Sequence, residues 1–394
     1  MKSLNLILLF ISFFIFECSL FQNKTESDPE IQIETDSSTQ TPEIKDDKWE
    51  EVASIVKPEP SYKYIALSDK IKFHIEPKFF MVSPFQDKLA YVKYQEKKEL
   101  KEGYIDASGK IVIATNYDFP FYPFFYGMAR VVKDNKTGYL GRNGKIAIPL
   151  QFQDAGDFQD TITWFKSKGK YGFINIEGKT IIEPIYDLVE SYQEGLACVS
   201  LKGKFGYINE KGQIVIPLQF QEAYSFKEGL ASVKQNGKFF FINKYGKKAI
   251  PLNFDFANSF YEGLARVRIN GKYGYVNKKG EWVVKAELDQ MYHDAFHFRE
   301  GRAVFMKGDK YGYLDRNGKV VIEPKFDFAD SFSEDLAVVA VNNKVGYINR
   351  FGEYVIKPQF ENGESFSEGF AAVKKGDVYG FIKKEDIAKE VEIK

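Results

Sequence analysis

Two histidines four residues apart, His293 and His297, are the residues in this chain best suited to metal binding. They lie near Asp289 and Asp294 in the segment AELDQMYHDAFHFREGR. On a helix both imidazoles would share one face and could hold an ion such as Zn²⁺. The segment lacks the glutamate of a zinc-protease helix, and its phenylalanines match aromatic residues that recur elsewhere in the chain. We therefore expect exposed loop histidines rather than a metal site.

Two tryptophans and three arginines are the candidate binding residues. Trp164 and Trp282 could stack on a carbohydrate or fill a core, and packing is the favoured interpretation for large aromatic side chains. Arg266, Arg299 and Arg302 add a local positive potential, although surface arginines alone do not define a site. These five residues form the predicted binding surface.

A line of carboxylates is the other chemical feature. One glutamate precedes the same turn again and again along the chain, at Glu194, Glu228, Glu262, Glu300, Glu334 and Glu368. An enzyme needs a catalytic group once, so recurrence favours capping of that turn through backbone N–H groups. The same argument applies to the polar residue after the aromatic of each connection, at Asp187, Gln221, Asp255, Asp327 and Glu361.

No established catalytic motif is present. The sequence contains no Gly-rich phosphate loop between a strand and a helix, no GxSxG, no HExxH and no Cys/His ligand spacing. The segment DRNGK at 315–319 resembles part of a calcium loop, but it lacks the later glutamate and recurs as a turn. We therefore expect neither a cofactor nor an enzymatic activity.

The carboxylates and arginines belong to an internal repeat. The stretch 201–226, LKGKFGYINEKGQIVIPLQFQEAYSF, recurs from one end of the mature chain to the other. An aromatic-Gly-aromatic step marks each copy at Gly103, Gly138, Gly172, Gly206, Gly274, Gly312, Gly346 and Gly380, and one copy has Phe240 in place of the glycine. The spacings are 35, 34, 34, 34, 34, 38, 34 and 34 residues, the mark of a repeat array.

Each unit reads as a small antiparallel meander. Strands at 230–234 and 238–243 flank Asn236-Gly237, a strong hairpin signal, and a third strand ends at Pro251. A Phe-rich segment supplies a short fourth strand. Both faces of a unit carry apolar residues, so we expect each sheet to be covered on both sides. Small residues such as Gly206 and Ala231 would let neighbouring sheets approach closely.

The predicted fold is therefore all-β: tandem meanders of about 34 residues, with three or four antiparallel strands each, stacked like propeller blades. Nine copies exceed the roughly four to eight blades of common rings, which favours an open, curved array over a large ring. The N-terminal KFHIEP could nevertheless pair with the last copy, which has no VIxP strand of its own, and close the ring.

The N-terminal segments differ from the repeats. Residues 1–17 carry one early lysine and an apolar run, as a secretory signal does. Residues 18–57 are rich in Ser, Thr, Asp, Glu and Pro and are predicted to be a disordered tether. The repeat domain spans 58–383, and residues 384–394 form a C-terminal cap with a short helix.

Charge and cysteine content limit the partners. Lys plus Arg and Asp plus Glu are both 55, so no net field favours nucleic acid. Aromatic residues make up 16% of the chain, which suits buried β-structure. Cys198 is the only thiol besides Cys18, so no disulfide framework is expected, and Cys198 is predicted to be a buried strand residue.

Two resemblances follow from these residues. Lys2, an apolar run and then Cys18 resemble a bacterial lipoprotein signal, although Glu17 stands where a small residue is usual. The units KFGYIN at 204–209, KYGYVN at 272–277 and KYGYLD at 310–315 resemble the WG repeats, which include the KWG repeats of Leptospira. Here Tyr or Phe replaces the signature Trp. The first resemblance implies lipidation of Cys18, and the second implies a repeat architecture with interaction surfaces.

The sequence thus predicts a non-enzymatic, extracytoplasmic lipoprotein with a β-repeat binding surface. A lipid would anchor it to a bacterial membrane, at the outer membrane or cell surface rather than the inner membrane. Its partner would be an unidentified protein or glycan. The alternative is a propeller-like glycan-binding or hydrolytic protein of the cell envelope.

Overall fold

The computed structural model describes residues 71–117, 122–288 and 297–387. The chain divides into two units, Met1–Lys63 and Tyr64–Lys394, and all described residues belong to the second. The predicted signal segment, the tether with Cys18, and His293 lie outside the described residues, as does the cap beyond residue 387.

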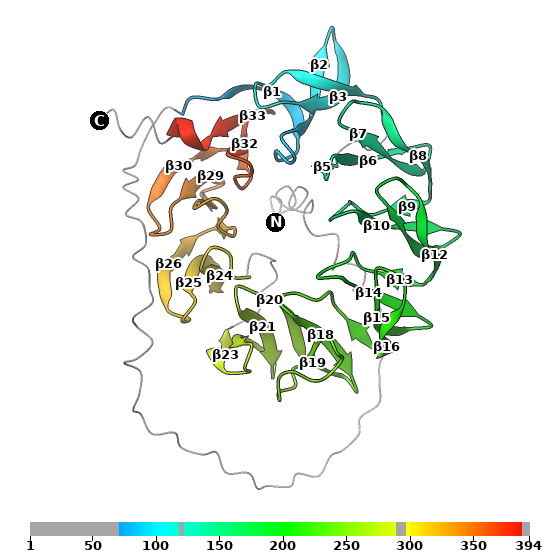
Figure 1. Cartoon of the computed structure of the whole chain (residues 1–394). Coiled ribbons are helices and arrows are strands. Elements are labelled where there is room, and N and C mark those ends of the chain that lie inside the picture. The colour runs from blue at the N-terminus through cyan, green and yellow to red at the C-terminus, as the bar shows by residue number, and fades with distance from the viewer. Residues whose placement is uncertain (1–70, 118–121, 289–296, 388–394) are drawn as a thin grey trace, which may run out of the picture. The chain divides into compact units, whose positions relative to one another are not determined.

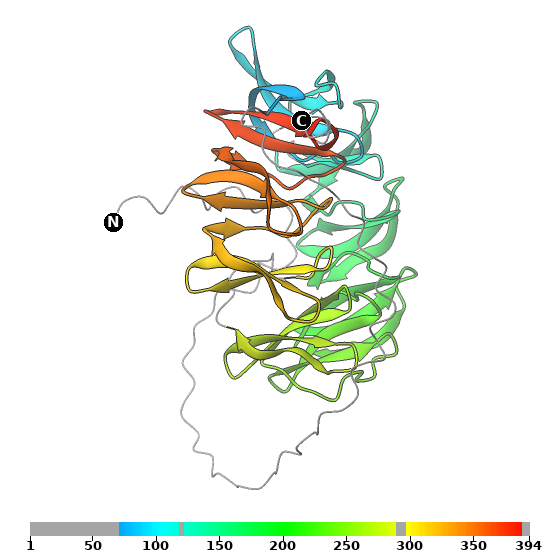
Figure 2. The ribbon, with the colours of Figure 1, turned by 90° about the vertical axis from the view of Figure 1, so that its left-hand side faces the viewer.

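Within the described residues, eight antiparallel sheets follow one another, and the seven-stranded one contains two blades, so that nine blades are formed. We number the blades along the chain. In Figure 1 they follow one another around a ring, with the short first strands inside and the fourth strands at the periphery. Figure 2 shows the same blades from the side, layered one upon the next.

The second and third strands of each blade form its central hairpin. The second strands are β2 (Ala90–Glu96), β6 (Met128–Lys133), β10 (Ile162–Ser167), β14 (Leu196–Leu201), β18 (Leu230–Gln235), β21 (Leu264–Ile269), β24 (Arg302–Lys307), β28 (Ala337–Val341) and β32 (Phe370–Lys375). The third strands are β3 (Glu99–Ile105), β7 (Lys136–Gly141), β11 (Lys170–Asn175), β15 (Lys204–Asn209), β19 (Lys238–Asn243), β22 (Lys272–Asn277), β25 (Lys310–Asp315), β29 (Lys344–Ile348) and β33 (Val378–Lys383). The predicted hairpin at Asn236-Gly237 is confirmed, with φ of 50° and 77°.

The inner and outer strands flank this hairpin. The inner, first strands are β5 (Phe124–Phe125), β9 (Asp154–Ala155), β13 (Leu188–Val189), β17 (Glu222–Ala223), β20 (Phe256–Tyr261), β27 (Phe328–Ala329) and β31 (Asn362–Gly363). The outer, fourth strands are β4 (Ile111–Thr115), β8 (Ile146–Phe152), β12 (Thr180–Tyr186), β16 (Ile214–Phe220), β23 (Trp282–Leu288), β26 (Val320–Phe326) and β30 (Tyr354–Phe360).

The strand β1 (Ile75–Val82) closes the ring. Its beginning pairs with β33 (Ile75 opposite Phe381), and its end pairs with β2 (Val82 opposite Val92). It therefore supplies the outer strand of blade 9 and the inner strand of blade 1. The preference for an open array was wrong, because the pairing of KFHIEP with the last copy satisfies two edges that an open stack would leave exposed.

The repeated glycine makes room for the outer strand of its own blade. Phe205 pairs with Phe220 of the outer strand β16, and Tyr207 pairs with Ile216. The outer strand therefore has extra residues opposite Gly206 and bulges there. A Cβ on Gly206 would lie 2.6 Å from the carbonyl oxygen of Ile216. The glycine is thus needed within the blade, and not, as we expected, between neighbouring blades.

Blade 5 shows what happens without this glycine. Phe240 occupies the position, and the segment after β19 keeps only the isolated bridges of Phe239 with Phe254 and of Ile242 with Lys248. The sheet of blade 5 accordingly has three strands, whereas most blades have four. A side chain at this position and a regular fourth strand exclude each other.

The hydrophobic core lies between successive blades. One cluster joins Tyr207 and Ile216 of blade 4 to Phe226, Val233 and Ile242 of blade 5. A hydroxyl extends this contact, since Tyr207 donates a hydrogen bond of 2.8 Å to the carbonyl of Tyr224 in the next blade. The predicted stacking of sheet on sheet is therefore confirmed.

A helical turn occupies residues 384–387, at the start of the segment predicted to be the C-terminal cap. Among the described residues, no helical stretch has the length and apolar character needed to cross a membrane.

Candidate functional site

The recurring glutamates, with Asp87 in blade 1, join most blades to the next. Their carboxylates accept hydrogen bonds from backbone N–H groups, as predicted, but the donors belong to the following repeat. The pairs, at 2.7–3.0 Å, are Glu194 with Gly229, Glu228 with Gly263, Glu262 with Gly301, Glu300 with Asp335, Glu334 with Gly369, Glu368 with Asp87 and Lys88, and Asp87 with Gly127.

Basic residues of the following blade complete most of these contacts. Their ion pairs are Lys244–Glu194 at 3.2 Å, Lys278–Glu228 at 3.1 Å, Arg316–Glu262 at 2.9 Å, Arg350–Glu300 at 3.4 Å and Arg142–Asp87 at 2.9 Å. Where Tyr126 replaces the carboxylate in blade 2, the basic position of blade 3 is Ile176. The same contact recurs at most junctions of the described ring, which identifies these carboxylates as structural.

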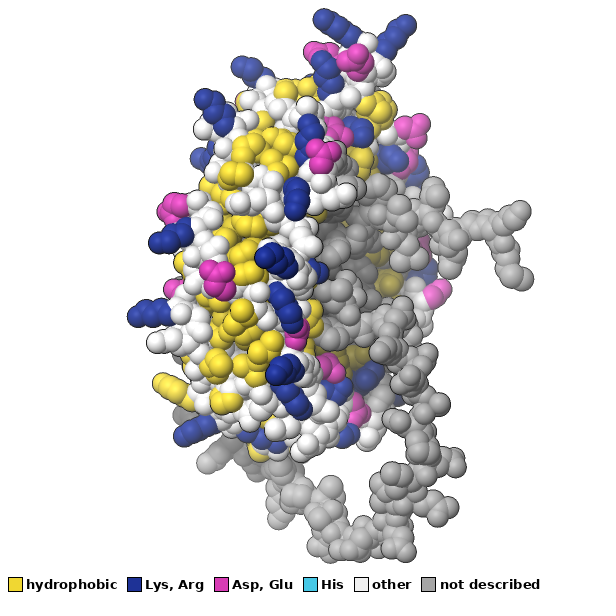
Figure 3. Space-filling view, turned by 90° about the vertical axis from the view of Figure 1, so that its right-hand side faces the viewer, with side chains coloured by type: hydrophobic (Ala, Val, Ile, Leu, Met, Phe, Trp, Pro, Cys, Tyr) yellow, Lys and Arg dark blue, Asp and Glu magenta, His cyan; other side chains and the backbone are white. Residues whose placement is uncertain are grey.

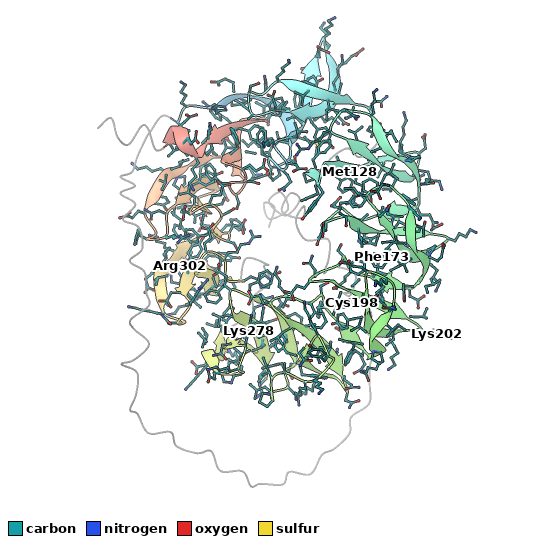
Figure 4. All side chains as sticks on the ribbon, in the orientation of Figure 1. Met128, Phe173, Cys198, Lys202, Lys278 and Arg302 are labelled. Atoms are coloured by element: carbon teal, nitrogen blue, oxygen red, sulfur yellow. The ribbon has the colours of Figure 1, made fainter. Side chains whose placement is uncertain are left out.

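The polar residues of the connections form a second set of ties. Asp187 accepts the backbone N–H of Lys202 at the end of the β14–β15 hairpin and contacts Lys170 of the preceding blade. Figure 4 shows Lys202 at the periphery of blade 4. These bonds lower the pKa of the Asp187 carboxyl. The predicted turn role of these residues is therefore confirmed, with an added contact between blades.

Blades 2 and 3 share a half-buried ion pair that interrupts this regularity. Arg130 Nε lies 3.1 Å from Asp157 Oδ1, and its guanidinium stacks over Tyr122 at 3.6 Å. Arg130 also donates to the carbonyl of Ala155 at 2.8 Å. Burial outweighs the attraction of Arg130 and raises the pKa of Asp157. We did not predict this pair, although Asp157 stands where most copies carry serine.

The predicted residue His297 of blade 7 occupies the repeat position that Asp157 occupies in blade 3. Its ring stacks on Tyr261 with 4.1 Å between centroids, and Lys227 lies over that tyrosine at 3.7 Å. The expectation of an exposed loop histidine is wrong for His297, which is half-buried. Burial, together with Arg266 and other nearby cations, lowers its pKa to about 3.

In the described part of the chain, His297 is not part of a metal-binding cluster. The described residues contain no group of three or more His, Cys, Asp or Glu side chains that could hold a metal ion. His293 lies outside the described residues, so its distance from His297 is not defined. The neutral imidazole of His297 packs against an aromatic ring in a positively charged setting, which disfavours a cation.

The structure brings only some of the other candidates together. Arg266 is buried near His297, whereas Arg299 is exposed and Arg302 is half-buried with its Nη1 donating to the carbonyl of Gly301. Figure 4 places Arg302 in blade 7, next to the blade of Lys278.

The two tryptophans belong to different blades. Trp164, in blade 3, is half-buried and packs edge-on against Tyr171, with 5.6 Å between ring centroids. Trp282, in blade 6, is 36% exposed on the outer strand and packs edge-on against Phe254. The tryptophans and arginines therefore do not form one continuous site.

Cys198 is buried in the sheet of blade 4, as predicted, and Figure 4 labels its place. Its Sγ donates to the carbonyl of Ala223 at 3.4 Å. Burial raises the pKa of the thiol, which leaves it in its unreactive, protonated form.

The outer strands of blades 1–4 carry a feature that we did not predict. Their outward side chains are apolar and exposed to 38–58%, and we call Val112, Ile146, Ile181, Ile185, Ile214 and Val215 the outer apolar band. We expected both faces of each sheet to be covered, and this is wrong here: Ile216 is buried, but Ile214 and Val215 are open to solvent.

The band is specific to one side of the ring. Figure 3 views that side and shows hydrophobic side chains gathered along it, with lysines and arginines on either flank. The outer strand of blade 7 instead carries Lys325 where blade 3 has Ile185, and in blade 8 Val355 is buried where Val215 of blade 4 is exposed. The sequence signal was the pair of adjacent apolar residues in IVIP, which we attributed to a covered sheet.

Small four-stranded antiparallel sheets, packed face to face and closed by pairing of the first and last strands, define the β-propeller class of protein. The family model described as "WG containing repeat" matches residues 103–136, 138–171, 171–205, 205–239, 239–273, 273–311, 311–344 and 346–379. The chain belongs to the WG repeat family. None of the curated proteins matches it.

Several solved structures are similar at low sequence identity. The dihydro-heme d1 dehydrogenase NirN is 14% identical over 68% of this chain and 78% of that chain, with a TM-score of 0.40. BamB from Moraxella catarrhalis is 11% identical over 77% and 96%, with a TM-score of 0.35. The WD40 domain of SCAP from fission yeast is 9% identical over 81% and 99%, with a TM-score of 0.36.

Proposed function

We propose that this protein is a non-enzymatic binding protein whose outer apolar band receives a short apolar segment of a partner protein. The observation that supports the proposal most directly is the exposure of Ile181, Ile185, Ile214 and Val215 on adjacent blades. Apolar patches of this kind mark interaction surfaces in soluble proteins. A regular frame with one deviating face is also how repeat proteins present a binding surface.

The chain itself provides a model for the occupant. Val355 of blade 8 has the same place in its outer strand as Val215 in blade 4, because Ile356 and Ile216 pair with equivalent tyrosines. Val215 is 43% exposed, but Val355 is only 6% exposed. Ile71, Phe73 and Ile387, which lie close to the two ends of the described repeat domain, pack against the cluster that contains Val355. A partner segment with similarly spaced apolar side chains would cover blades 3 and 4 in the same way.

The absence of enzymatic activity is part of the proposal. The carboxylates that recur along the chain are engaged in ties between blades, so their frequency is explained without catalysis. The carboxyl group of Asp157 is likewise held by Arg130. No cofactor and no nucleic acid enter the proposal, since the charges of the chain balance at 55 and 55.

A photo-crosslinking residue at position 181 tests the binding surface. We expect it to form one discrete adduct in envelope extracts, whereas the same residue at Glu323 of blade 7 forms none. The adduct should be lost when Ile185 and Val215 are both changed to Lys, because two charges would be buried without partners. Peptide mapping should place the crosslink in a short segment with at least two apolar side chains.

The control is the double variant Glu323→Lys, Gln359→Lys, which adds lysines to the outer strands of blades 7 and 8 and should leave the adduct unchanged. Equal crosslinking from 181 and 323, or none from either, would contradict the proposal. An adduct between two copies of this chain would replace it with self-association.

We further propose that a lipid on Cys18 anchors the protein to the outer membrane or the cell surface of a bacterium. Support comes from the signal-like residues 1–17, and from residues 18–57, whose reach would be about 35 Å for a flexible chain. We expect the wild-type protein in the detergent phase after phase separation and Cys18→Ala in the aqueous phase. Cys198→Ala is the matched control and should stay with the detergent. The anchor is ruled out if wild type and Cys18→Ala both partition into water.

A further inference from the structure

The junction of blades 9 and 1 is formed by residues from the two ends of the repeat domain, and we call it the seam. It comprises the β1–β33 pairing, a hydrogen bond of 2.7 Å from Ser367 Oγ to the carbonyl of Phe85, and the bonds of Glu368 to the backbone of blade 1. The chain does not connect β33 to β1, so only non-covalent contacts close the ring there, including the core packing of Phe79 and Phe85 against Phe381.

The seam lacks a hydrogen bond that other junctions have. Glu190 of blade 4 accepts a hydrogen bond of 2.6 Å from Ser225 of blade 5. Asp330 of blade 8 accepts one of 3.3 Å from Ser365 of blade 9. The corresponding carboxyl group at the seam is that of Glu364.

The register identifies the residue that faces Glu364. Ser333 donates to the carbonyl of Phe366 at 2.8 Å, just as Ser367 donates to that of Phe85. Phe85 therefore holds the place of Phe366, and Pro84 holds the place of Ser365. Proline offers neither a hydroxyl nor an N–H group.

Glu364 is correspondingly left without a donor. Its Oε2 is buried and has no hydrogen-bond partner among the described residues. Burial raises the pKa of Glu364 to about 7. The titratable groups that interact with it are Tyr347 and Tyr379. Neither is a cation that could stabilise the ionised carboxylate.

A histidine also lies across the same seam. His74 Nδ1 is 3.1 Å from Asp386 of the C-terminal helical turn, and His74 Nε2 is 3.1 Å from the carbonyl oxygen of Ala107 in blade 1.

The other groups near His74 are already engaged. Asp106, next to Ala107, accepts hydrogen bonds from Ser108 and Lys110 of its own turn. Lys383 of β33 pairs with Glu385 at 2.9 Å. The ring of Phe370 flanks His74 with 5.4 Å between centroids.

We propose that the seam is a proton-operated latch, in which protonated Glu364 keeps blades 9 and 1 together and loss of its proton opens the ring. A carboxyl group whose pKa is raised in the closed state stabilises that state at low pH, and the stabilisation is lost as the pH rises from the ordinary value of about 4.3 towards 7.

Hydrogen–deuterium exchange of the full chain at pH 6 and pH 8, corrected for the intrinsic rates, tests the latch. Exchange across β1 and β33 should be about tenfold faster at pH 8. Exchange in β25 and β26 of blade 7, which contains the same Ile-Glu-Pro-Lys-Phe sequence as β1, should change little. Glu364→Gln should remove most of the pH dependence at the seam.

Glu190→Gln is the matched control, since its partner Ser225 is present, and it should leave the seam unchanged. If Glu364→Gln does not fold, Pro84→Ser tests the proposal instead. This variant restores a hydroxyl donor opposite Glu364 and should reduce the pH dependence of exchange at the seam. The proposal would be overturned if exchange at the seam did not depend on pH, or if exchange in blade 7 changed by the same factor. It would also be overturned if the pH dependence at the seam persisted in both Glu364→Gln and Pro84→Ser.

Discussion

Gly206→Ala should destabilise the protein by at least about 3 kcal/mol, the upper end of the usual cost of overpacking. The added Cβ would lie 2.6 Å from the carbonyl oxygen of Ile216 and 2.8 Å from the backbone nitrogen of Leu218. Both are backbone atoms of the outer strand, so they can move only if the strand leaves the sheet. Urea unfolding followed by circular dichroism would measure the loss.

Phe240→Leu is the control for Gly206→Ala. Blade 5 already accommodates a side chain at this position, and its outer segment is already displaced from the ladder. The substitution should therefore cost less than about 3 kcal/mol, the lower end of the usual cost of a Phe→Ala change, because leucine keeps part of the side chain. A stability of Gly206→Ala within about 0.5 kcal/mol of wild type, the range of neutral surface changes, would contradict the role assigned to the glycine.

Phe79→Ala should lower the midpoint of the main unfolding transition, with a loss of about 3–5 kcal/mol. Phe79 is 1% exposed and lies in the core cluster that joins β1 to blade 9. Its Cα faces Tyr94 on one side and Tyr379 on the other, so one side chain serves two blades. The closed ring makes this loss global, because no terminal blade can separate without breaking the ring.

Phe326→Ala provides the matched comparison. Phe326 ends the same Ile-Glu-Pro-Lys-Phe sequence in blade 7 and is 0% exposed. Differential scanning calorimetry should show similar decreases for both variants in one transition. A separate early transition in Phe79→Ala, with the main transition at the wild-type temperature, would show that the N-terminal strand frays independently and that the ring is not a cooperative unit.

Local signals were sufficient to predict the blade. The 34-residue spacing, the Asn-Gly turn and the aromatic residues around Gly206 each reflect interactions between residues close in the chain. For the same reason the buried state of Cys198 and the structural role of the recurring carboxylates could be inferred from one repeat. The partner of each carboxylate could not, because Gly229 lies 35 residues beyond Glu194 and meets it only after the blades stack.

The candidate functional residues were missed where their contacts come from distant parts of the chain. His297 resembled a loop residue because its surroundings, Tyr261 and Lys227, come from two earlier blades. The sequence around Glu364 did not mark it as unusual. The residue that faces it is Pro84, which offers no hydrogen-bond donor and lies 280 residues earlier in the chain. The apolar residues of the outer apolar band could be seen in the sequence, but their exposure could not. Ile216 is buried and Ile214 exposed because the neighbouring blade covers only Ile216.

The amino-acid sequence by itself determined the repeat, the strands of each blade and the side chains that face its neighbours, since these depend on local backbone preferences and on alternation along a strand. Only the tertiary structure decided that nine blades close into a ring and which outward faces remain open. Closure depends on the summed rotation from blade to blade and on one pairing between β1 and β33. A small change in that rotation at each blade would separate these two strands, and no single repeat encodes the sum.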